Sequence, residues 1–172
     1  MNLRPARLAD APDIQSIYAH HVLNSTGTFD EVPPSVEEFE ARIRRVTAAG
    51  WAWLVATDAS GVLGYAYYNQ LRDRSAYRFS AEDSVYVRDD VRGQGVGRAL
   101  VAALLDHAAE RGFRQMFAII GDSDNVGSVG LHAALGFARI GLLKAAGFKH
   151  GRWLDVVYMQ KALGAGDRTL PA

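Results

Sequence analysis

The segment RGQGVGR, residues 92–98, decides the fold because it joins a strand-like stretch to the most regular helical pattern in the chain. The preceding SAEDSVYV, residues 80–87, has the β-branched and aromatic content of a strand. The following apolar residues recur on one helical face, which Gly112 ends: Val96, Leu100, Val101, Leu104, Leu105 and Ala108. Glycines at such a turn let backbone N–H groups approach a ligand, and the helix dipole favours an anion there. The segment therefore predicts a phosphate-binding turn.

Two familiar phosphate loops do not match this segment. A Walker A loop ends in Gly-Lys-Ser/Thr, whereas Gly97 is followed by Arg98 and Ala99. A dinucleotide fingerprint has the spacing G-x-G-x-x-G, whereas Gly93, Gly95 and Gly97 are spaced G-x-G-x-G. An ordinary strand-to-helix turn, with glycines for tight packing, is the alternative to a phosphate site.

Strand and helix patterns alternate along the rest of the chain. Helices are expected at 11–24, from a capping box at Ser35 and Glu38 to Gly50, from the glycine turn to Gly112, and at 125–135. Strands are expected at 2–8, 51–58, 62–71, 80–87 and 113–120, with strand-like sequence over 137–161. This order predicts one α/β or α+β domain over residues 1–163, with a mixed sheet against helices, and a flexible tail at 164–172.

Composition excludes several classes of function. The 172 residues contain no cysteine, which excludes disulfides, thiolate metal sites and a cysteine nucleophile. Nineteen basic residues balance nineteen acidic ones, so no overall field favours nucleic acid or an anionic membrane. There is no membrane-spanning run and no secretory signal pattern at the start, which predicts a cytoplasmic protein.

The glycine turn also carries a more specific pattern. Arg92, Gly95 and Gly97 match the Q/R-x-x-G-x-G/A motif of the GNAT acyltransferase superfamily, which the chain resembles. Three further segments resemble its phosphinothricin and methionine sulfoximine N-acetyltransferase branch: RSAYRFSAEDSVYV at 74–87, LHAALGF at 131–137 and GFKHGRWLD at 147–155. The resemblance extends to about Lys161; one departure is Leu71, where the branch tends to carry an aromatic residue.

The resemblance implies a fold, a coenzyme and an assembly. The fold is the GNAT fold, a mixed, mostly antiparallel twisted sheet flanked by helices. The donor is acetyl-CoA, no metal is required, and relatives of this branch form homodimers. The residues implied to contact acetyl-CoA are Val85, Tyr86, Val87, Arg92, Gly93, Gln94, Gly95, Val96, Gly97, Arg98, Asn125 and Ser128.

Glu82 is the candidate general base. N-acetylation needs a neutral amine, and a free amino group is mostly protonated at pH 7. Glu82 matches the catalytic glutamate of the family, and burial near aromatic residues would raise its pKa from about 4.3. The alternative is an exposed strand residue in a cross-strand ion pair. Alternation along a strand places Asp83 on the opposite face from Glu82.

His132 is the candidate acid for the departing thiolate. It occupies a position where the superfamily often has a tyrosine and where this branch usually has histidine. A histidine titrates near neutrality and can donate a proton or hold a water. The alternative is a histidine packed on a short helix with one hydrogen bond.

Three arginines and one phenylalanine are candidates for binding the substrate. Arg72, Arg74 and Arg78 lie just before Glu82, and guanidinium groups match carboxylate and phosphinate geometry. The alternative is a solvated basic loop. Phe29 matches a branch position that walls the substrate site; otherwise it is a core aromatic.

With the resemblance, these residues predict an acetyl-CoA-dependent N-acetyltransferase that works by direct transfer. The acceptor that the resemblance implies is the α-amino group of a small amino acid analogue. Two rivals stay open. The first rival is acetylation of a protein amine or of another small amine. For a protein amine we expect an open, acidic groove instead of a closed, arginine-lined pocket. A non-catalytic CoA sensor predicts tight binding without turnover.

Overall fold

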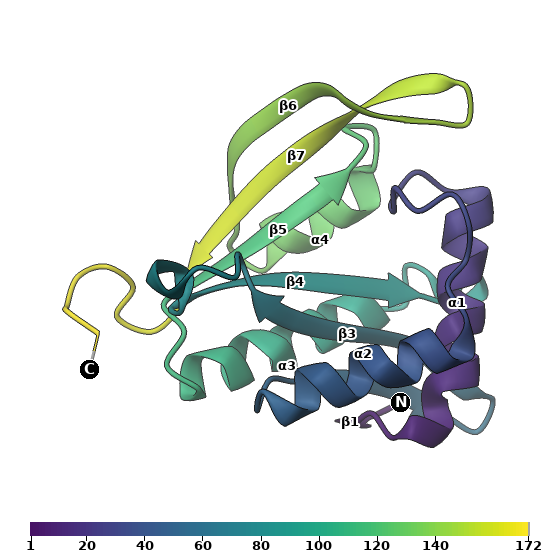
Figure 1. The fold of residues 1–172 in the computed structure, drawn as a ribbon, viewed down its shortest axis with the longest axis horizontal. Helices are drawn as coiled ribbons and strands as arrows, with labels where there is room; N and C mark the ends of the chain where they lie inside the picture. The colour runs from purple at the N-terminus through teal and green to yellow at the C-terminus, as the bar shows by residue number, and fades with distance from the viewer. Residues whose placement is uncertain (172) are drawn as a thin grey trace.

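The computed structural model describes residues 1–171, and its elements follow the predicted order (Figure 1). The strands are β1 (Asn2–Pro5), β2 (Trp53–Asp58), β3 (Gly61–Gln70), β4 (Ser80–Val87), β5 (Gln115–Gly121), β6 (Ala138–Lys149) and β7 (Arg152–Ala162). The helices are α1 (Ala11–Asn24), α2 (Val36–Ala48), α3 (Val96–Glu110) and α4 (Val126–Ala134). Short 3-10 turns occupy Leu8–Asp10, Ser75–Tyr77 and Asp89–Val91.

The seven strands form one sheet in the order β1-β2-β3-β4-β5-β7-β6. Every neighbouring pair is antiparallel except β4 and β5, which are parallel. The predicted mixed, mostly antiparallel sheet flanked by helices is confirmed. The parallel pairing covers only 80–83 against 115–118, although both strands continue beyond it, so β4 and β5 separate toward their carboxyl ends.

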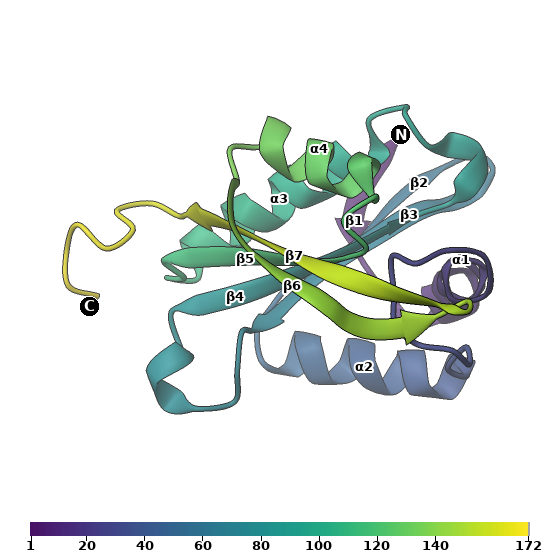
Figure 2. The same cartoon turned by 90° about the horizontal axis from the view of Figure 1, so that it is seen from above.

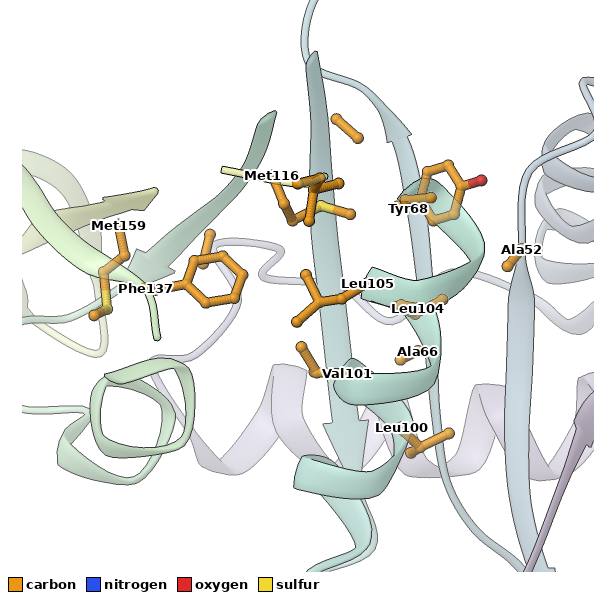
Figure 3. Close-up of a cluster of buried hydrophobic side chains, with 14 of the residues drawn as sticks. Ala52, Ala66, Tyr68, Leu100, Val101, Leu104, Leu105, Met116, Phe137 and Met159 are labelled. Atoms are coloured by element: carbon orange, nitrogen blue, oxygen red, sulfur yellow. The ribbon is translucent and has the colours of Figure 1, made fainter. Parts of the chain in front are cut away.

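Helices cover both faces of the sheet (Figure 2). On one face α3 packs its apolar side against the sheet, and Ala66, Met116 and Met159 belong to the larger core on this face (Figure 3). On the other face α1 and α2 enclose a second core, rich in aromatic residues, that includes Phe39, Trp53 and Tyr65. The sheet therefore separates two compartments that communicate where β4 and β5 part.

Local sequence signals explain the helix boundaries. The predicted capping box is present: Ser35 N–H donates to Glu38 Oε2 at 2.7 Å, and Glu38 N–H donates to Ser35 Oγ at 3.2 Å. Both bonds satisfy N–H groups that the first turn of α2 leaves free. Asn125 caps α4 in the same sense, its Oδ1 accepting from Ser128 N–H.

Two expectations need correction or comment. The first strand ends at Pro5 instead of residue 8, because Asp10 accepts from the Arg7 N–H and pairs with Arg4, which starts a 3-10 turn. Within the expected tail 164–172, Arg114 donates to main-chain carbonyls of 166 and 170, and residue 172 lies outside the described residues.

No helix within residues 1–171 is both long and apolar enough to cross a bilayer.

Candidate active site

A cavity of about 900 Å³, here called the main cavity, opens where β4 and β5 separate. It collects most of the residues expected to bind a coenzyme. Those on its wall are Val85, Tyr86, Val87, Arg92, Gly93, Gly95, Val96, Gly97, Arg98, Asn125 and Ser128. Gln94 is the exception, because its side chain turns back toward the Asp90 carbonyl, 3.5 Å away, and does not line the main cavity.

The glycine turn is shaped for an anion. Gly93 and Gly95 have φ of +73° and +83°, and a Cβ on either would meet no atom within 4 Å, so both leave open space. Gly95 is the N-cap of α3 and offers no side-chain cap to the first N–H groups of the helix. These N–H groups, with Arg92 and Arg98 on the same wall, fit a pyrophosphate.

Gly97 serves packing as well as lining the main cavity. A Cβ there would stand 2.7 Å from Leu131 Cδ1, so the glycine allows α3 and α4 to come together. The packing interpretation of the turn therefore applies to Gly97 and not to Gly93 or Gly95.

The main cavity reaches both faces of β4. Its wall includes Val85 and Val87, which belong to the α3 side, and Ser84 and Tyr86, which belong to the α1–α2 side. Strand β5 contributes residues of both faces in the same way, Ile119 and Ile120 among them. A molecule bound at the glycine turn can therefore reach the opposite compartment between the two strands.

Glu82 lies on the α1–α2 side of β4, beside Asn69 of β3 and Phe117 of β5 in the sheet register. Its side chain is 32% exposed, and its Oε2 lies 3.6 Å from Arg72 Nη1. Burial raises the pKa of Glu82, the positive charge of Arg72 opposes that shift, and the neighbouring charge of Asp83 adds to it. A raised pKa makes this carboxylate a stronger base than an ordinary glutamate.

The other two arginines have different surroundings. The guanidinium of Arg78 lies over the Phe79 ring, 4.5 Å from its centroid, and donates to the Ser75 carbonyl. The main-chain carbonyl of Arg74 accepts a hydrogen bond from Gln70. Of the three candidates, Arg72 is the one that the structure brings to Glu82.

His132 forms a buried pair with Asp83. Its Nε2 lies 3.0 Å from Asp83 Oδ2, its Nδ1 lies 2.8 Å from the Ser128 carbonyl, and the two side chains are 3% and 1% exposed. A carbonyl only accepts, so Nδ1 carries a proton. Burial alone would lower the pKa of His132, but the hydrogen bond and charge of Asp83, with the Ser128 carbonyl, raise it. Both ring nitrogens thus have protein partners.

Asp83 is the residue that the sequence analysis did not assign. Strand alternation correctly placed it opposite Glu82, and that same alternation turns it toward α4 and the main cavity. Its second oxygen, Oδ1, is buried and has no hydrogen-bond partner among the described residues. The alternation along β4 indicates the face on which Asp83 lies, but the sequence carries no signal for its pairing with His132.

Phe29 lies away from the glycine turn, in the loop between α1 and α2. Its ring is 38% exposed and packs on Gly121, at the end of β5, and on Gly147 of β6. Phe29, the expected wall of the substrate site, therefore lies against the end of β5 and against β6.

A glycine turn at a helix N-terminus, beside a parallel strand pair that opens, is the arrangement that the GNAT resemblance leads us to expect. The sequence model of the acetyltransferase (GNAT) domain matches residues 3–158, and the chain belongs to this family.

Proteins of known activity are similar to this chain over nearly its whole length. The chain is 52% identical to the phosphinothricin N-acetyltransferase of Alcaligenes faecalis, over 98% of this chain and 86% of that protein. It is 43% identical to the L-methionine sulfoximine/L-methionine sulfone acetyltransferase of Pseudomonas paraeruginosa, over 92% of each. The crystal structure of a phosphinothricin acetyltransferase from Sinorhizobium meliloti, in complex with AcCoA, superposes with a TM-score of 0.96 at 46% identity, covering 99% of this chain and 92% of that one. The chain is therefore an N-acetyltransferase of the GNAT family.

Proposed function

We propose that the chain transfers the acetyl group of acetyl-CoA to the α-amino group of a small amino acid analogue of the phosphinothricin or methionine sulfoximine type. The observation that carries the proposal is the pairing of Glu82 with Arg72 on one side of the β4–β5 opening and the anion-binding glycine turn on the other. Acetyl-CoA supplies the acetyl group as a thioester. Two of the relatives that match over more than nine tenths of the chain are named for acetylating these compounds.

Glu82 is proposed to accept the proton of the substrate ammonium, directly or through water. The raised pKa of Glu82 supports this role, because a general base works best when its pKa approaches the working pH. The neutral amine then attacks the thioester carbonyl, and the backbone of Val85 to Val87 stabilises the charge that develops on its oxygen. The chain contains no cysteine, so an acetyl-cysteine intermediate is excluded. We therefore propose direct transfer of the acetyl group to the amine.

His132 was a candidate acid for the departing thiolate. Because both of its nitrogens have protein partners, we propose that His132 acts as a positioning residue between β4 and α4 in this arrangement. The departing thiolate then takes its proton from solvent.

Substrate binding is proposed for Arg72, with Phe29 as the wall of the amine site. A guanidinium beside the base can hold the carboxylate or phosphinate of the substrate in two hydrogen bonds. Arg74 and Arg78 remain candidates only if the segment before β4 changes its side-chain arrangement on binding.

The test is a thiol-release assay with acetyl-CoA and a panel of phosphinothricin, methionine sulfoximine, common amino acids and a lysine peptide. The variant Glu82→Gln should lower kcat by about a hundredfold, a typical general-base effect, with acetyl-CoA affinity unchanged. The matched control is Glu37→Gln on the exposed surface of α2, which should keep the wild-type rate.

Three outcomes of this assay would contradict the proposal. An unchanged kcat in Glu82→Gln would remove the base. Turnover of the peptide alone would indicate a protein amine as acceptor. Tight acetyl-CoA binding without turnover of any amine would indicate a sensor.

A homodimer is also proposed, with the β6–β7 hairpin in its interface. Strand β6 is an edge of the sheet and, with β7, exposes four large apolar side chains: Ile140, Leu143, Phe148 and Trp153. An exposed apolar edge strand favours a partner, and a second copy provides a matching surface. Light scattering should give twice the monomer mass, and Trp153→Lys should halve it; a monomeric wild type would refute the dimer.

A cytoplasmic location is also proposed and is checked by cell fractionation.

A further inference from the structure

The ring of Phe29 lies in a slot made by two glycines from different strands, here called the Phe29 slot. A Cβ on Gly147 of β6 would stand 2.3 Å from Phe29 Cε2, and a Cβ on Gly121 of β5 would stand 2.9 Å from Phe29 Cε1. Real Cβ atoms do not approach ring carbons that closely, so only glycine leaves the ring this position. We infer that the β6–β7 hairpin determines the width of the amine site by setting the position of Phe29.

A buried lysine of the same hairpin fixes the backbone beside Phe29. Lys149 is 3% exposed, and its Nζ donates to the carbonyls of Ser25 at 3.0 Å and Thr28 at 2.8 Å. A buried ammonium is costly unless it is hydrogen-bonded, so these two bonds tie the loop firmly to β6. Figures 1 and 2 both show the end of the hairpin beside the loop that follows α1.

The sheet register places the Phe29 slot across from Glu82. Glu82 is the neighbour of Phe117 in β5, and Gly121 lies on the same face of β5 four residues further along. That separation is about 13 Å, since a strand rises roughly 3.3 Å per residue. We place the small amino acid of the proposed function between the carboxylate and the ring. The inference therefore rests on the proposed amine site, of which Glu82 is one end and Phe29 the other.

The fixed position of Phe29 limits the length of the acceptor that the amine site can bind. The ring cannot withdraw toward the sheet or the hairpin, because Gly121 and Gly147 already contact it and Lys149 holds the chain before it. A longer acceptor must then be accommodated by a change in the hairpin, not by movement of Phe29 alone. Gly147 and Lys149 are specificity-determining and positioning residues in this sense, and neither contacts the coenzyme turn.

The first experiment adds one methyl group to the slot. Gly147→Ala should push the ring into the amine site and raise KM for phosphinothricin or methionine sulfoximine about tenfold, the scale of one methylene in a pocket. The Kd for acetyl-CoA, measured by calorimetry, should change less than twofold. Gly141→Ala in the same strand is the matched control, because its Cβ would lie at an ordinary 3.8 Å from Tyr158 Cβ.

The second experiment separates the slot from the amine site by a double-mutant cycle with Phe29→Ala. Gly147→Ala should destabilise the wild type toward urea, yet cost little in the Phe29→Ala background, because the clash has lost its partner. An equal cost in both backgrounds would refute the slot. If the stability effects of Gly147→Ala and Phe29→Ala are coupled but Gly147→Ala leaves the amine KM unchanged, the slot does not set the width of the amine site. Absence of amine turnover in the wild type would refute the proposed function, while the stability cycle still reports on the slot.

Lys149→Met tests the positioning of the loop, with the exposed Lys144→Met as its control. Lys149→Met should raise the amine KM severalfold and leave kcat and the acetyl-CoA Kd close to wild type. A lower kcat with an unchanged KM would show that Lys149 acts on another step and would overturn its assignment.

Discussion

At the residue scale, two adjacent carboxylates have different surroundings. Glu82 and Asp83 are neighbours in β4, and strand alternation sends them to opposite faces of the sheet. Glu82 meets Arg72 in the amine compartment, whereas Asp83 meets His132 beside the main cavity. One strand thus supplies a candidate base to one compartment and a structural pair to the other.

The charge of Arg72 should be visible in the pH profile of the reaction. Arg72 lowers the pKa of Glu82 against the effect of burial, so Arg72→Met should raise that pKa further. A base works only when deprotonated, so the acid limb of kcat should move to higher pH in Arg72→Met, and the amine KM should rise. Arg74→Met is the control, and its acid limb should match the wild type. A shift to lower pH in Arg72→Met would contradict the assignment of the limb to Glu82.

The Asp83–His132 pair should make stability depend on pH. The pKa of His132 is raised in the folded protein, so its contribution to the free energy of unfolding is complete below the unfolded value of about 6.5. That contribution is lost as the pH rises through the raised pKa. Urea unfolding should therefore show a larger fall in stability between pH 6 and pH 9 for the wild type than for Asp83→Asn. Parallel curves for the two proteins would show that the pair holds no extra proton.

At the element scale, the glycine that begins α3 has a different role from a glycine inside α4. Gly95 adopts a φ of +83° at the N-cap and faces open space, whereas Gly130 within α4 has open space and no such backbone requirement. The first glycine leaves backbone N–H groups accessible; the second only lowers helix propensity.

Gly95→Val should therefore weaken acetyl-CoA binding at least tenfold, since a β-branched side chain strains this φ and covers the N–H groups. Gly130→Ala should bind acetyl-CoA normally and gain roughly 0.5–1 kcal/mol of stability from better helix propensity. Calorimetry and urea unfolding measure the two effects. Wild-type affinity in Gly95→Val would remove the coenzyme from this turn.

Local signals were enough to predict most elements but not the contacts between them. The capping box at Ser35 and the glycine turn act within a few residues, so they could be read from the sequence. The Asp83–His132 pair joins residues 49 apart, and Lys149 reaches Thr28 across 121 residues. Such contacts depend on how the sheet curves and on where β4 and β5 separate, which no periodicity encodes.

At the scale of the whole molecule, the sheet separates the glycine turn from the proposed amine site. The glycine turn and α3 lie on one face, and the proposed amine site lies on the face that α1 and α2 cover; Figure 2 shows these helices on the two sides of the sheet. The main cavity at the β4–β5 opening joins the two faces. Coenzyme binding and amine chemistry then depend on different sets of residues. A substitution in one compartment should leave the thermodynamics of the other unchanged.

This separation predicts how acetyl-CoA stabilises the protein. A ligand that binds only the folded state adds about 2.7 kcal/mol of stability at a hundred times its Kd. The wild type and Glu82→Gln should gain this amount equally, because Glu82 lies across the sheet from the glycine turn. Gly95→Val, whose Kd is expected to be at least tenfold weaker, should gain about 1.4 kcal/mol or less at the same concentration. Urea unfolding with and without acetyl-CoA measures all three proteins, and a loss of the gain in Glu82→Gln would show that the two compartments are coupled through β4.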